Sequence, residues 1–527
     1  MFFPIPESFL TALAESSHWF NCGLEREGLR ATNKGKIATT FHPAELGAKL
    51  THPHITTDFG EAQLELITSP HPTTNAALAE LEQLHAWVWS KLDANQEVLW
   101  PNSMPCGLPQ SEDAIAIANY GVSNAAELKH IYRLGLTYRY GSAMQTVSGV
   151  HLNLSLADQL LALLAQQDGG ANDQAFRNRI YFALMRNYRR FSFVINYLLG
   201  ASTIIDASMA RLSHTIQRQD FDPIGPTMQD ISPDNQALVG IGATTLRQSD
   251  VGYVAPQQRG MGMCFNHLDS YIQGVNANIT SSHPQFASIG ITDSQGNYRQ
   301  LGAGLLQIEN EYYTAVRPKH PTSKGQRPLL ALAENGVEYL ELRNLDINPL
   351  APCGIDQTGL DFMSLMFLWC AALPSREFTY ADCQQVENNE LVSATRGRAP
   401  DTSIQLGQDN MLMIAAVERV LEQLALFANQ LDRLGHGQYA QALDSLRRAG
   451  PLSQALEDAC RKQHYRNFCI AQAGQNRAAL APLSAESRQR FNAQTKQSWE
   501  EVAEIEAAHA TNPVPFATFF TAYMQGL

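Results

Sequence analysis

The chain of 527 residues carries 51 acidic and 38 basic side chains, a formal net charge of −13, and 44% of its residues are hydrophobic. This length suffices for a large core and for more than one domain. The negative charge argues against a nucleic-acid-binding protein, because phosphate contacts need a surplus of lysine and arginine.

The cysteines and the apolar segments indicate the cellular setting. The eight cysteines are scattered and form no C-x-x-C pair, which is typical of free thiols rather than of a disulfide framework or a zinc site. The start of the chain, MFFPIPESFLTALAESS, lacks the basic residues of a signal peptide. No apolar segment is long enough to cross a bilayer. We therefore expect a soluble cytoplasmic protein without a membrane or nucleic-acid partner.

Polar and apolar residues alternate in five short segments, which predicts β-strands with one chemically distinct face. The segments are Gly23–Arg30, Glu61–Thr68, Gly149–Ser155, Gln307–Tyr313 and Tyr339–Arg343. In the first segment Glu25 and Glu27 lie two residues apart and share a face of a strand, whereas a helix would separate them by about 200°. His151, Asn153 and Arg343 occupy equivalent polar faces in later segments.

Apolar residues recur at three- and four-residue spacing in four longer segments, which predicts helices. These segments are Asn75–Leu92, Asp173–Leu199, Asp409–Leu434 and Ser484–Ala508. The basic segment Ala315–Pro328 (AVRPKHPTSKGQRP) contains proline and glycine, which predicts a mobile loop. We expect a catalytic α+β unit over residues 1–383 and a mostly helical C-terminal portion over residues 384–527 that packs on it, as one structural unit.

The polar faces of the predicted strands hold carboxylates, amides, histidine, tyrosine and arginine, but no lysine. A solvated sheet face would also alternate, and this alternative stays open. However, clustered carboxylates repel one another unless cations neutralise them. Magnesium binds oxygen ligands and shares them with nucleotide phosphates, so it is the natural partner. The chain has no G-x-x-x-x-G-K-[ST] phosphate loop, so metals, arginines and the basic segment would hold a bound nucleotide.

Six blocks of sequence, which occur in a fixed order, are more specific than the alternation of polar and apolar residues. They read GLEREGLR, ITTDFGEAQLELIT, YRLGLTYRYGSAMQTVSGVHLNLS, TTLRQSDVGY, LQIENEYYTAVRPK and GVEYLELRNLDINP. They closely resemble the proteobacterial type of the glutamate–cysteine ligase family. The resemblance implies a mainly antiparallel sheet that forms a glutamine-synthetase-like catalytic cleft surrounded by helices. It also implies ATP-dependent ligation of the γ-carboxylate of L-glutamate to the amine of L-cysteine through γ-glutamyl phosphate, the first step of glutathione biosynthesis.

The resemblance assigns roles to residues inside these blocks. The implied ligands of Mg²⁺ or Mn²⁺ are Glu25, Glu27, Asp58, Glu65, His151 and Glu341. The implied substrate-binding residues are Tyr132, Gln145, Arg247, Tyr253, Tyr313 and Arg343, and Arg343 is also the implied catalytic residue. The implied contacts to nucleotide phosphates are Arg133, Arg317 and Lys319. For Glu61, Glu309 and Glu311, the roles of ligand, support for a ligand and structural partner stay open.

The same resemblance implies the partners of the protein. These are L-glutamate, L-cysteine and ATP, with glutathione as a feedback inhibitor of a monomeric enzyme. Gly28 and Gly60 stand where we expect other residues in relatives, but neither is a ligand. Two alternatives stay open: a related ligase that joins glutamate to a different amine, and a non-catalytic protein that binds a nucleotide or an amino acid. The apparently complete ligand set argues against the second, because clusters of like charge are costly to retain.

Overall fold

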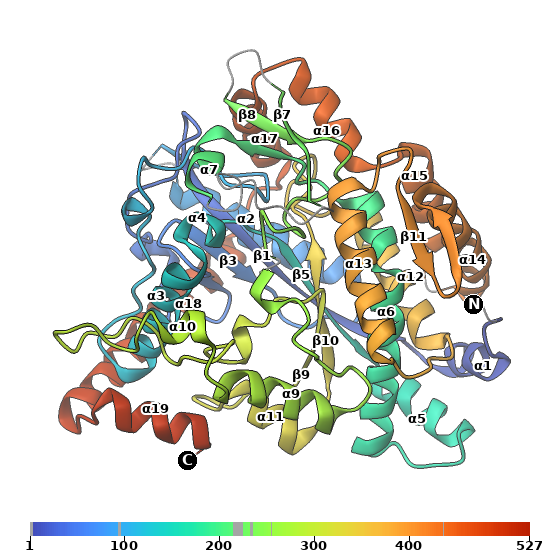
Figure 1. The fold of residues 1–527 in the computed structure, drawn as a ribbon, viewed down its shortest axis with the longest axis horizontal. Coiled ribbons are helices and arrows are strands. Elements are labelled where there is room, and N and C mark those ends of the chain that lie inside the picture. The colour runs from blue at the N-terminus through green and yellow to red at the C-terminus, as the bar shows by residue number, and fades with distance from the viewer. Residues whose placement is uncertain are drawn as a thin grey trace.

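The central element of the fold is a mainly antiparallel sheet with the strand order β2–β3–β1–β5–β10–β9, and β4 pairs with the last residues of β1 (Figure 1). The computed structural model describes residues 4–92, 96–213, 225–231, 236–253, 256–435 and 437–526. The strands are β1 (Phe20–Thr32), β2 (Ile55–Thr57), β3 (Gln63–Ile67), β4 (Glu97–Leu99), β5 (Val150–Leu156), β9 (Val316–Lys319) and β10 (Tyr339–Leu345). The predicted strands around residues 23–30, 61–68, 149–155 and 339–343 are therefore confirmed.

The pairing of these strands gives the sheet one apolar and one polar face. Leucines such as Leu24 alternate with the acidic residues and are fully buried. The β1–β5 register places Glu25 opposite His151, and the β1–β3 register places Glu27 opposite Glu65. Because directly opposed residues point to the same side of a sheet, these four side chains gather on one face.

Helices cover the apolar face and the edges of the sheet (Figure 1). The helix α2 (Thr74–Leu92) packs on β1, and α6 (Gln174–Leu199) packs on β10, with α12 (Gln357–Ala372) and α13 (Tyr380–Arg396) packed on α6. The other α-helices among the described residues before 384 are α1 (Glu7–Glu15), α3 (Asn124–Tyr140), α4 (Ser142–Gln145), α5 (Asp158–Gln167), α7 (Ala207–Leu212), α9 (Leu268–Thr280), α10 (Pro284–Ala287) and α11 (Pro328–Asn335).

The C-terminal portion is mostly helical. Its helices after α13 are α14 (Met413–Arg433), α15 (Tyr439–Ala449), α16 (Leu452–Arg461), α17 (Tyr465–Ala479), α18 (Ala485–Thr511) and α19 (Phe516–Gln525). Two small sheets complete the structure: β6 (Ile204–Asp206) with β7 (Met228–Asp230) and β8 (Ala237–Gly240), and β11 (Ser403–Leu406) with β12 (Asp409–Leu412). This arrangement confirms the predicted α+β class, while the division at residue 383 stays a prediction. Within the described ranges, no helix is both long and apolar enough to span a membrane.

Three of the four predicted helices are confirmed by α2, α6 and α18. The helix α6 begins directly after Asp173, whose side chain accepts a hydrogen bond from the backbone N–H of Phe176 at 2.8 Å and caps the helix. The fourth prediction is wrong at its start, because Asp409–Leu412 pairs with β11 as strand β12 and the helix begins only at Met413.

The prediction of a strand over Gln307–Tyr313 is wrong. This segment contains a short 3₁₀ helix, η5 (Glu309–Glu311). Glu309 accepts a hydrogen bond from Arg327 at 3.0 Å, and Glu311 accepts one from Arg139 at 2.8 Å. Partners that are distant in sequence therefore satisfy the two carboxylates, and no neighbouring strand is involved.

The prediction of a mobile loop over residues 315–328 is wrong at both ends, whereas residues 320–327 lie in neither a helix nor a strand. Val316–Lys319 forms the edge strand β9, which pairs with β10, and α11 begins at Pro328. Pro318 suits an edge strand because proline has no N–H to donate to a further strand. As a result, Arg317 lies opposite Glu341 and Lys319 lies opposite Tyr339 in the sheet.

Arg26 and Arg30 are buried charged residues on the apolar side of β1. Arg30 forms an ion pair with Glu97 at 2.6 Å. Arg26 donates one hydrogen bond, from Nη2 to the carbonyl of Trp100 at 3.0 Å. Its guanidinium occupies the space beside Gly28, where a Cβ atom would lie 1.7 Å from Arg26 Nη1. The glycine therefore leaves room for the arginine.

Candidate active site

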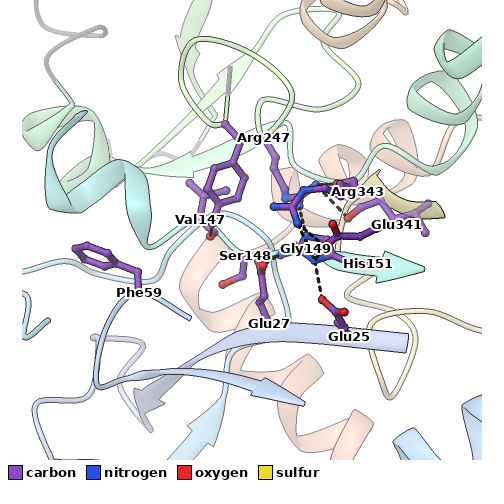
Figure 2. Close-up of polar contacts among 12 residues, drawn as sticks. Glu25, Glu27, Phe59, Val147, Ser148, Gly149, His151, Arg247, Glu341 and Arg343 are labelled. Atoms are coloured by element: carbon purple, nitrogen blue, oxygen red, sulfur yellow. Dashed lines mark hydrogen bonds and ion pairs between the residues drawn. The ribbon is translucent and has the colours of Figure 1, made fainter. Parts of the chain in front are cut away.

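Three of the predicted metal ligands meet on the polar face of the sheet (Figure 2). Glu25 of β1, His151 of β5 and Glu341 of β10 have ligand atoms within 4.8 Å of one another. His151 Nδ1 lies 3.2 Å from Glu25 Oε2 and 3.6 Å from Glu341 Oε1. His151 and Glu341 are buried, whereas Glu25 is partly exposed, so the cluster opens toward solvent on its Glu25 side.

The other three predicted ligands extend this cluster. Glu27 Oε1 lies 3.4 Å from His151 Nε2, and Glu27 Oε2 accepts a hydrogen bond from the backbone N–H of Gly149 at 2.8 Å. Glu65 lies opposite Glu27 in the sheet. Asp58 precedes β3, and it lies near enough that its charge, after burial, raises the pKa of Glu27. The fold therefore places the other three predicted ligands next to the group of Glu25, His151 and Glu341.

Basic side chains neutralise the Glu341 end of the cluster. Arg343 Nη1 donates to Glu341 Oε1 at 2.6 Å, and Lys319 Nζ lies 3.3 Å from Glu341 Oε2. Burial raises the pKa of Glu341, but Arg343 and Lys319 outweigh burial and hold this pKa well below its usual range. Burial also raises the pKa of Glu25, but His151 and Lys319 bring it below its usual value. We call Glu25, Glu341, His151, Arg343 and Lys319 the neutralised half.

At the opposite end of the cluster, no arginine or lysine of the described residues forms an ion pair with Glu27 or Glu65. Burial, followed by the charge of Asp58, raises the pKa of Glu27 to about 8. Burial and neighbouring carboxylates raise the pKa of Glu65 well above its usual value, and burial raises that of Asp58 despite the charge of Arg133. Lys129 of α3 lies near Glu65, and burial together with Arg133 lowers its pKa to about 8. We call Glu27, Asp58 and Glu65 the acidic half.

His151 is a neutral imidazole at neutral pH. Burial, together with the charge of Arg343, lowers its pKa to about 4, although Glu25 acts in the opposite direction. The neutral form of histidine is the one that binds metal ions. The structure therefore keeps a nitrogen ligand available among the carboxylates.

Arg247 lies beside His151 and is 1% exposed. Its Nη1 donates to the carbonyl of Arg343 at 2.8 Å, and its Nη2 lies 3.4 Å from His151 Nε2. A Cβ atom at Gly149 would lie 2.1 Å from Arg247 Nη2, so the glycine leaves room for this guanidinium. Arg247 Nε has no hydrogen-bond partner in the described part of the chain, which leaves one donor for a substrate carboxylate.

Four of the predicted substrate-binding residues, Tyr132, Gln145, Tyr253 and Tyr313, lie together. The rings of Tyr253 and Tyr313 stack with their centroids 5.4 Å apart. Gln145 Nε2 donates to the Tyr313 hydroxyl at 3.2 Å, and the Tyr253 hydroxyl donates to the carbonyl of Val147 at 2.5 Å. Tyr132 is close enough that Tyr313 contributes, after burial, to raising its pKa. Aromatic rings with polar groups at their tips suit a small amphipathic substrate.

A cavity of about 440 Å³ adjoins this pocket. Arg247, Arg343, Tyr253 and Tyr313 line its end near the cluster, and side chains of α6 and α13 line the other end. A cavity of this size, which combines apolar walls with a few polar groups, is typical of a binding site for a small molecule.

Two of the predicted phosphate contacts lie on β9. Lys319 points at Glu341, as described above. The Arg317 guanidinium is buried and donates to the backbone carbonyls of Asn310 and Tyr312, with the first bond at 2.8 Å. Arg317 therefore orders the chain next to the site, and Lys319 is the more accessible of the two cations.

The third predicted phosphate contact, Arg133, belongs to a cationic group around Tyr120. Lys49, Lys129 and Arg133 lie over the Tyr120 ring, 5.7, 5.1 and 4.7 Å from its centroid. Arg133 Nε also donates to the carbonyl of Asp58. Neither Lys129 nor Tyr120 was predicted, although the four-residue spacing of Lys129 and Arg133 places both on one side of a helix.

The three glutamates whose roles the sequence left open are structural partners of basic residues. Glu61 pairs with Lys49 at 2.5 Å and accepts a hydrogen bond from the backbone N–H of Asn119 at 2.8 Å. Glu309 and Glu311 bind the arginines described above.

Comparison with known proteins agrees with this geometry. The chain matches the glutamate–cysteine ligase family over residues 10–392. Relatives named glutamate–cysteine ligase from Azotobacter vinelandii and Pseudomonas aeruginosa (strain LESB58) are each 38% identical to it, over 96% and 98% of this chain and 94% and 96% of their own.

The fold is also similar to that of solved structures. The crystal structure of glutamate–cysteine ligase from Francisella tularensis in complex with AMP has a TM-score of 0.87 at 29% identity and covers 97% of this chain and 98% of that chain. A bifunctional glutathione synthetase from Pasteurella multocida shares the fold, with a TM-score of 0.65 at 23% identity over 89% of this chain and 53% of its own. The chain therefore belongs to the glutamate–cysteine ligase family.

Proposed function

We propose that the protein joins the γ-carboxylate of L-glutamate to the amine of L-cysteine at the carboxylate cluster. By its family the protein is an ATP-dependent ligase of glutathione biosynthesis. The observation that carries the assignment to this site is the meeting of Glu25, His151 and Glu341, with Glu27 3.4 Å from His151, beside Arg343 and Arg247.

The residues of the cluster fit Mg²⁺ or Mn²⁺. Five of the six are carboxylates, which hard divalent cations prefer as ligands. Glu341 Oε2 is buried and accepts no hydrogen bond from the described residues, although Lys319 lies nearby. The ions would be held by Glu25, Glu27, Asp58, Glu65, His151 and Glu341. When bound, they would neutralise the phosphates of ATP.

The first step transfers the γ-phosphoryl group of ATP to the γ-carboxylate of glutamate, which gives an acyl phosphate and ADP. Arg343 faces this group and stabilises the charge that moves onto the leaving ADP. Lys319 contacts the phosphates from the adjacent strand. Arg247 holds the α-carboxylate of glutamate through its free Nε. The chain thus acts by positioning and by charge, without a covalent intermediate on a protein side chain.

The second step forms the new amide bond. The amine of cysteine attacks the acyl carbon, the bond from that carbon to the phosphate oxygen breaks, and the amine loses a proton. Tyr132, Tyr253, Tyr313 and Gln145 enclose the cysteine side chain. Their packing also keeps water away from the acyl phosphate, which would otherwise hydrolyse.

The proposal also covers inhibition by the end product, the oligomeric state and the cellular location. Glutathione contains both substrate moieties, so it fills both subsites and inhibits the enzyme. We further propose a monomer in the cytoplasm. These points rest on the family resemblance and on the eight free cysteines.

The test is an incubation of the purified protein with ATP, Mg²⁺ and glutamate, in which ADP release is recorded with and without cysteine. The mass of the product is determined by mass spectrometry. We expect cysteine-dependent ADP release and the mass of γ-glutamylcysteine. Turnover with another amine but not with cysteine would indicate a related glutamate–amine ligase. Nucleotide binding without turnover for any amine would indicate a non-catalytic protein.

A further inference from the structure

Glu311, in the 3₁₀ helix η5, is a buried carboxylate that the proposed reaction does not use. Its Oε1 accepts hydrogen bonds from Arg139 Nη1 at 2.8 Å and from the Tyr140 hydroxyl at 2.9 Å. Its Oε2 accepts one from the backbone N–H of Gln307 at 2.8 Å. The side chains of Glu311 and Arg139 are both 0% exposed, so water does not compete for these bonds. The three donors therefore hold the carboxylate in one orientation.

The acceptor pocket lies beside Glu311. We use this name for the four side chains that are proposed to enclose the side chain of the ligated amine: Tyr132, Gln145, Tyr253 and Tyr313. Two of its walls come from distant parts of the chain, because Tyr132 belongs to α3 and Tyr313 follows η5. Burial is the main cause of the raised pKa of each of these two tyrosines, and the charge of Glu311 adds to it. The carboxylate therefore lies near both walls.

Gln307 connects Glu311 to the first wall. While Glu311 binds the backbone N–H of Gln307, the side-chain Nε2 of Gln307 donates to the backbone carbonyl of Tyr132 at 3.2 Å. The side-chain Oε1 accepts a hydrogen bond from the backbone N–H of Leu301 at 3.0 Å. A Cβ atom at Gly135 would lie 2.0 Å from this Oε1, so the glycine lets the Gln307 side chain approach α3 closely. The position of Gln307 thus affects the turn of α3 that carries Tyr132.

Gln258 connects Glu311 to the second wall. Its Nε2 donates to the backbone carbonyl of Glu311 at 2.8 Å and to the Tyr140 hydroxyl at 3.3 Å. Its Oε1 accepts a hydrogen bond from the backbone N–H of Tyr313 at 2.9 Å. The Tyr140 ring also packs edge-on against the Tyr313 ring, with the centroids 6.0 Å apart. Gln258 and Tyr140 therefore join Glu311 to the backbone and the ring of Tyr313.

We infer that Glu311 is a positioning residue of the acceptor pocket, which fixes the separation of Tyr132 and Tyr313 and thereby the side chain that the pocket selects. Glu311 acts through Gln307 and Gln258 rather than by contact with a substrate. The inference rests on the proposed function, because it takes this pocket to be the site of the acceptor side chain. A pocket with fixed walls discriminates between side chains that differ by one heavy atom, and this discrimination weakens when the walls are free to move.

Glu309 provides a matched control in the same 3₁₀ helix. Its Oε2 accepts a hydrogen bond from Arg327 Nε at 3.0 Å, and its Oε1 accepts one from the backbone N–H of Leu329 at 2.9 Å. These bonds connect η5 to α11 and not to the acceptor pocket. Glu309→Gln and Glu311→Gln each remove one negative charge from the partner of an arginine, so both variants share a general cost in stability. Thermal unfolding measures this cost.

The test compares cysteine with alanine as acceptors, because the two differ only in the thiol group. We expect Glu311→Gln to raise the KM for cysteine by about 10-fold, because an amide cannot accept all the hydrogen bonds of the carboxylate. The ratio of kcat/KM for cysteine to that for alanine should fall by about fivefold or more. The kcat with cysteine and the KM values for glutamate and ATP should stay within about twofold, because the reacting groups are unchanged. Glu309→Gln should leave all these quantities within about twofold.

Two results would overturn the inference. One is an equal change in the KM for cysteine in Glu309→Gln and Glu311→Gln, which would indicate a general effect on the fold. The other is an unchanged cysteine-to-alanine ratio in a folded Glu311→Gln. If Glu311→Gln does not fold, Tyr140→Phe decides, because it keeps the ion pair and removes only the hydroxyl. We then expect about a threefold rise in the KM for cysteine, and an unchanged KM would overturn the inference.

The outcomes separate this inference from the proposed function. A wild-type protein that forms no γ-glutamyl bond with any amine would defeat the proposed function. A wild-type protein that forms γ-glutamylcysteine, together with a Glu311→Gln variant of unchanged acceptor selectivity, would defeat only the role of Glu311.

Discussion

The two halves of the carboxylate cluster differ in how their charge is balanced. In the neutralised half, Glu341 binds Arg343 and lies next to Lys319, so its pKa stays well below the usual range. In the acidic half, among the described residues, neither Glu27 nor Glu65 forms an ion pair with arginine or lysine, and both have raised pKa values. Basic side chains therefore balance the charge of one half, whereas among the described residues the carboxylates of the other half have no such ion pairs, and by our proposal a bound cation would balance them.

The largest expected effect is in the neutralised half. By the proposed mechanism, Arg343→Ala removes the guanidinium that would face the transferring phosphoryl group, and we expect kcat to fall by on the order of 10²-fold or more. The measurement is steady-state ADP release at saturating glutamate and cysteine. Arg343→Lys is the control, since it keeps the charge but loses the fork geometry and should retain more activity. Normal turnover of Arg343→Ala would remove the assigned role.

The second prediction concerns pH and the acidic half. Glu27 has a pKa of about 8 in the folded protein against 4.5 for the unperturbed group. Between these values the folded state holds more protons than the unfolded state, so the free energy of unfolding falls as pH rises. We expect this group to contribute a loss of roughly 2 kcal/mol between about pH 6 and pH 8 without metal. Urea unfolding in the presence of a chelator measures it.

Glu27→Gln provides the comparison for this pH dependence. The variant cannot lose the proton, so its free energy of unfolding should change less over the same pH range. Added Mg²⁺ should also reduce the loss in the wild type, because the ion binds the charged carboxylate. Identical slopes for the two proteins would show that the charge on Glu27 is already balanced.

The third prediction compares the free energies of unfolding of two variants, one in each half of the cluster. Without metal, and at a pH above the raised pKa values of the acidic half, Glu65→Gln should raise the free energy of unfolding by roughly 1 kcal/mol, because it relieves repulsion among the ionised carboxylates. Glu341→Gln should lower it by roughly 1–3 kcal/mol, because it leaves Arg343 and Lys319 without their partner. Urea unfolding with and without Mg²⁺ tests both variants. Changes of the same sign would contradict the division into two halves.

The smallest expected effect lies outside both halves. Tyr313→Phe removes the hydroxyl that binds Gln145, and we expect about a threefold rise in the KM for cysteine. Stabilisation by Mg²⁺ should be unchanged, which makes this variant a control for the metal measurements. A loss of Mg²⁺ stabilisation in Tyr313→Phe would instead place the tyrosine next to the ions.

Much of the cluster could be predicted because alternation in a strand is local. Glu25 and Glu27 are two residues apart, so the sequence alone places them on one face, and pairing with β5 then adds His151. Asp58 is outside any alternating segment, and only the family resemblance pointed to it. Lys319 was expected in a loop, because its pairing with β10 depends on a strand distant from it in sequence.

The failures of prediction share one physical cause. The segment Gln307–Tyr313 alternates like the true strands, but Arg139 and Arg327 bind its glutamates and no strand pairs with it. Lys129 was missed because the carboxylates near it come from a different part of the chain. Arg189 lies on a helix in which charged residues usually face solvent, and only its tertiary contacts reveal that it is buried. Local patterns do not contain such contacts.

The close fit between Arg26 and Gly28 constrains how these two positions evolve. A methyl group at position 28 would overlap the guanidinium at position 26, which is the buried end of a flexible side chain. A larger residue at position 28 therefore requires either that this guanidinium moves or that position 26 carries a shorter side chain. The two positions should accordingly co-vary among relatives.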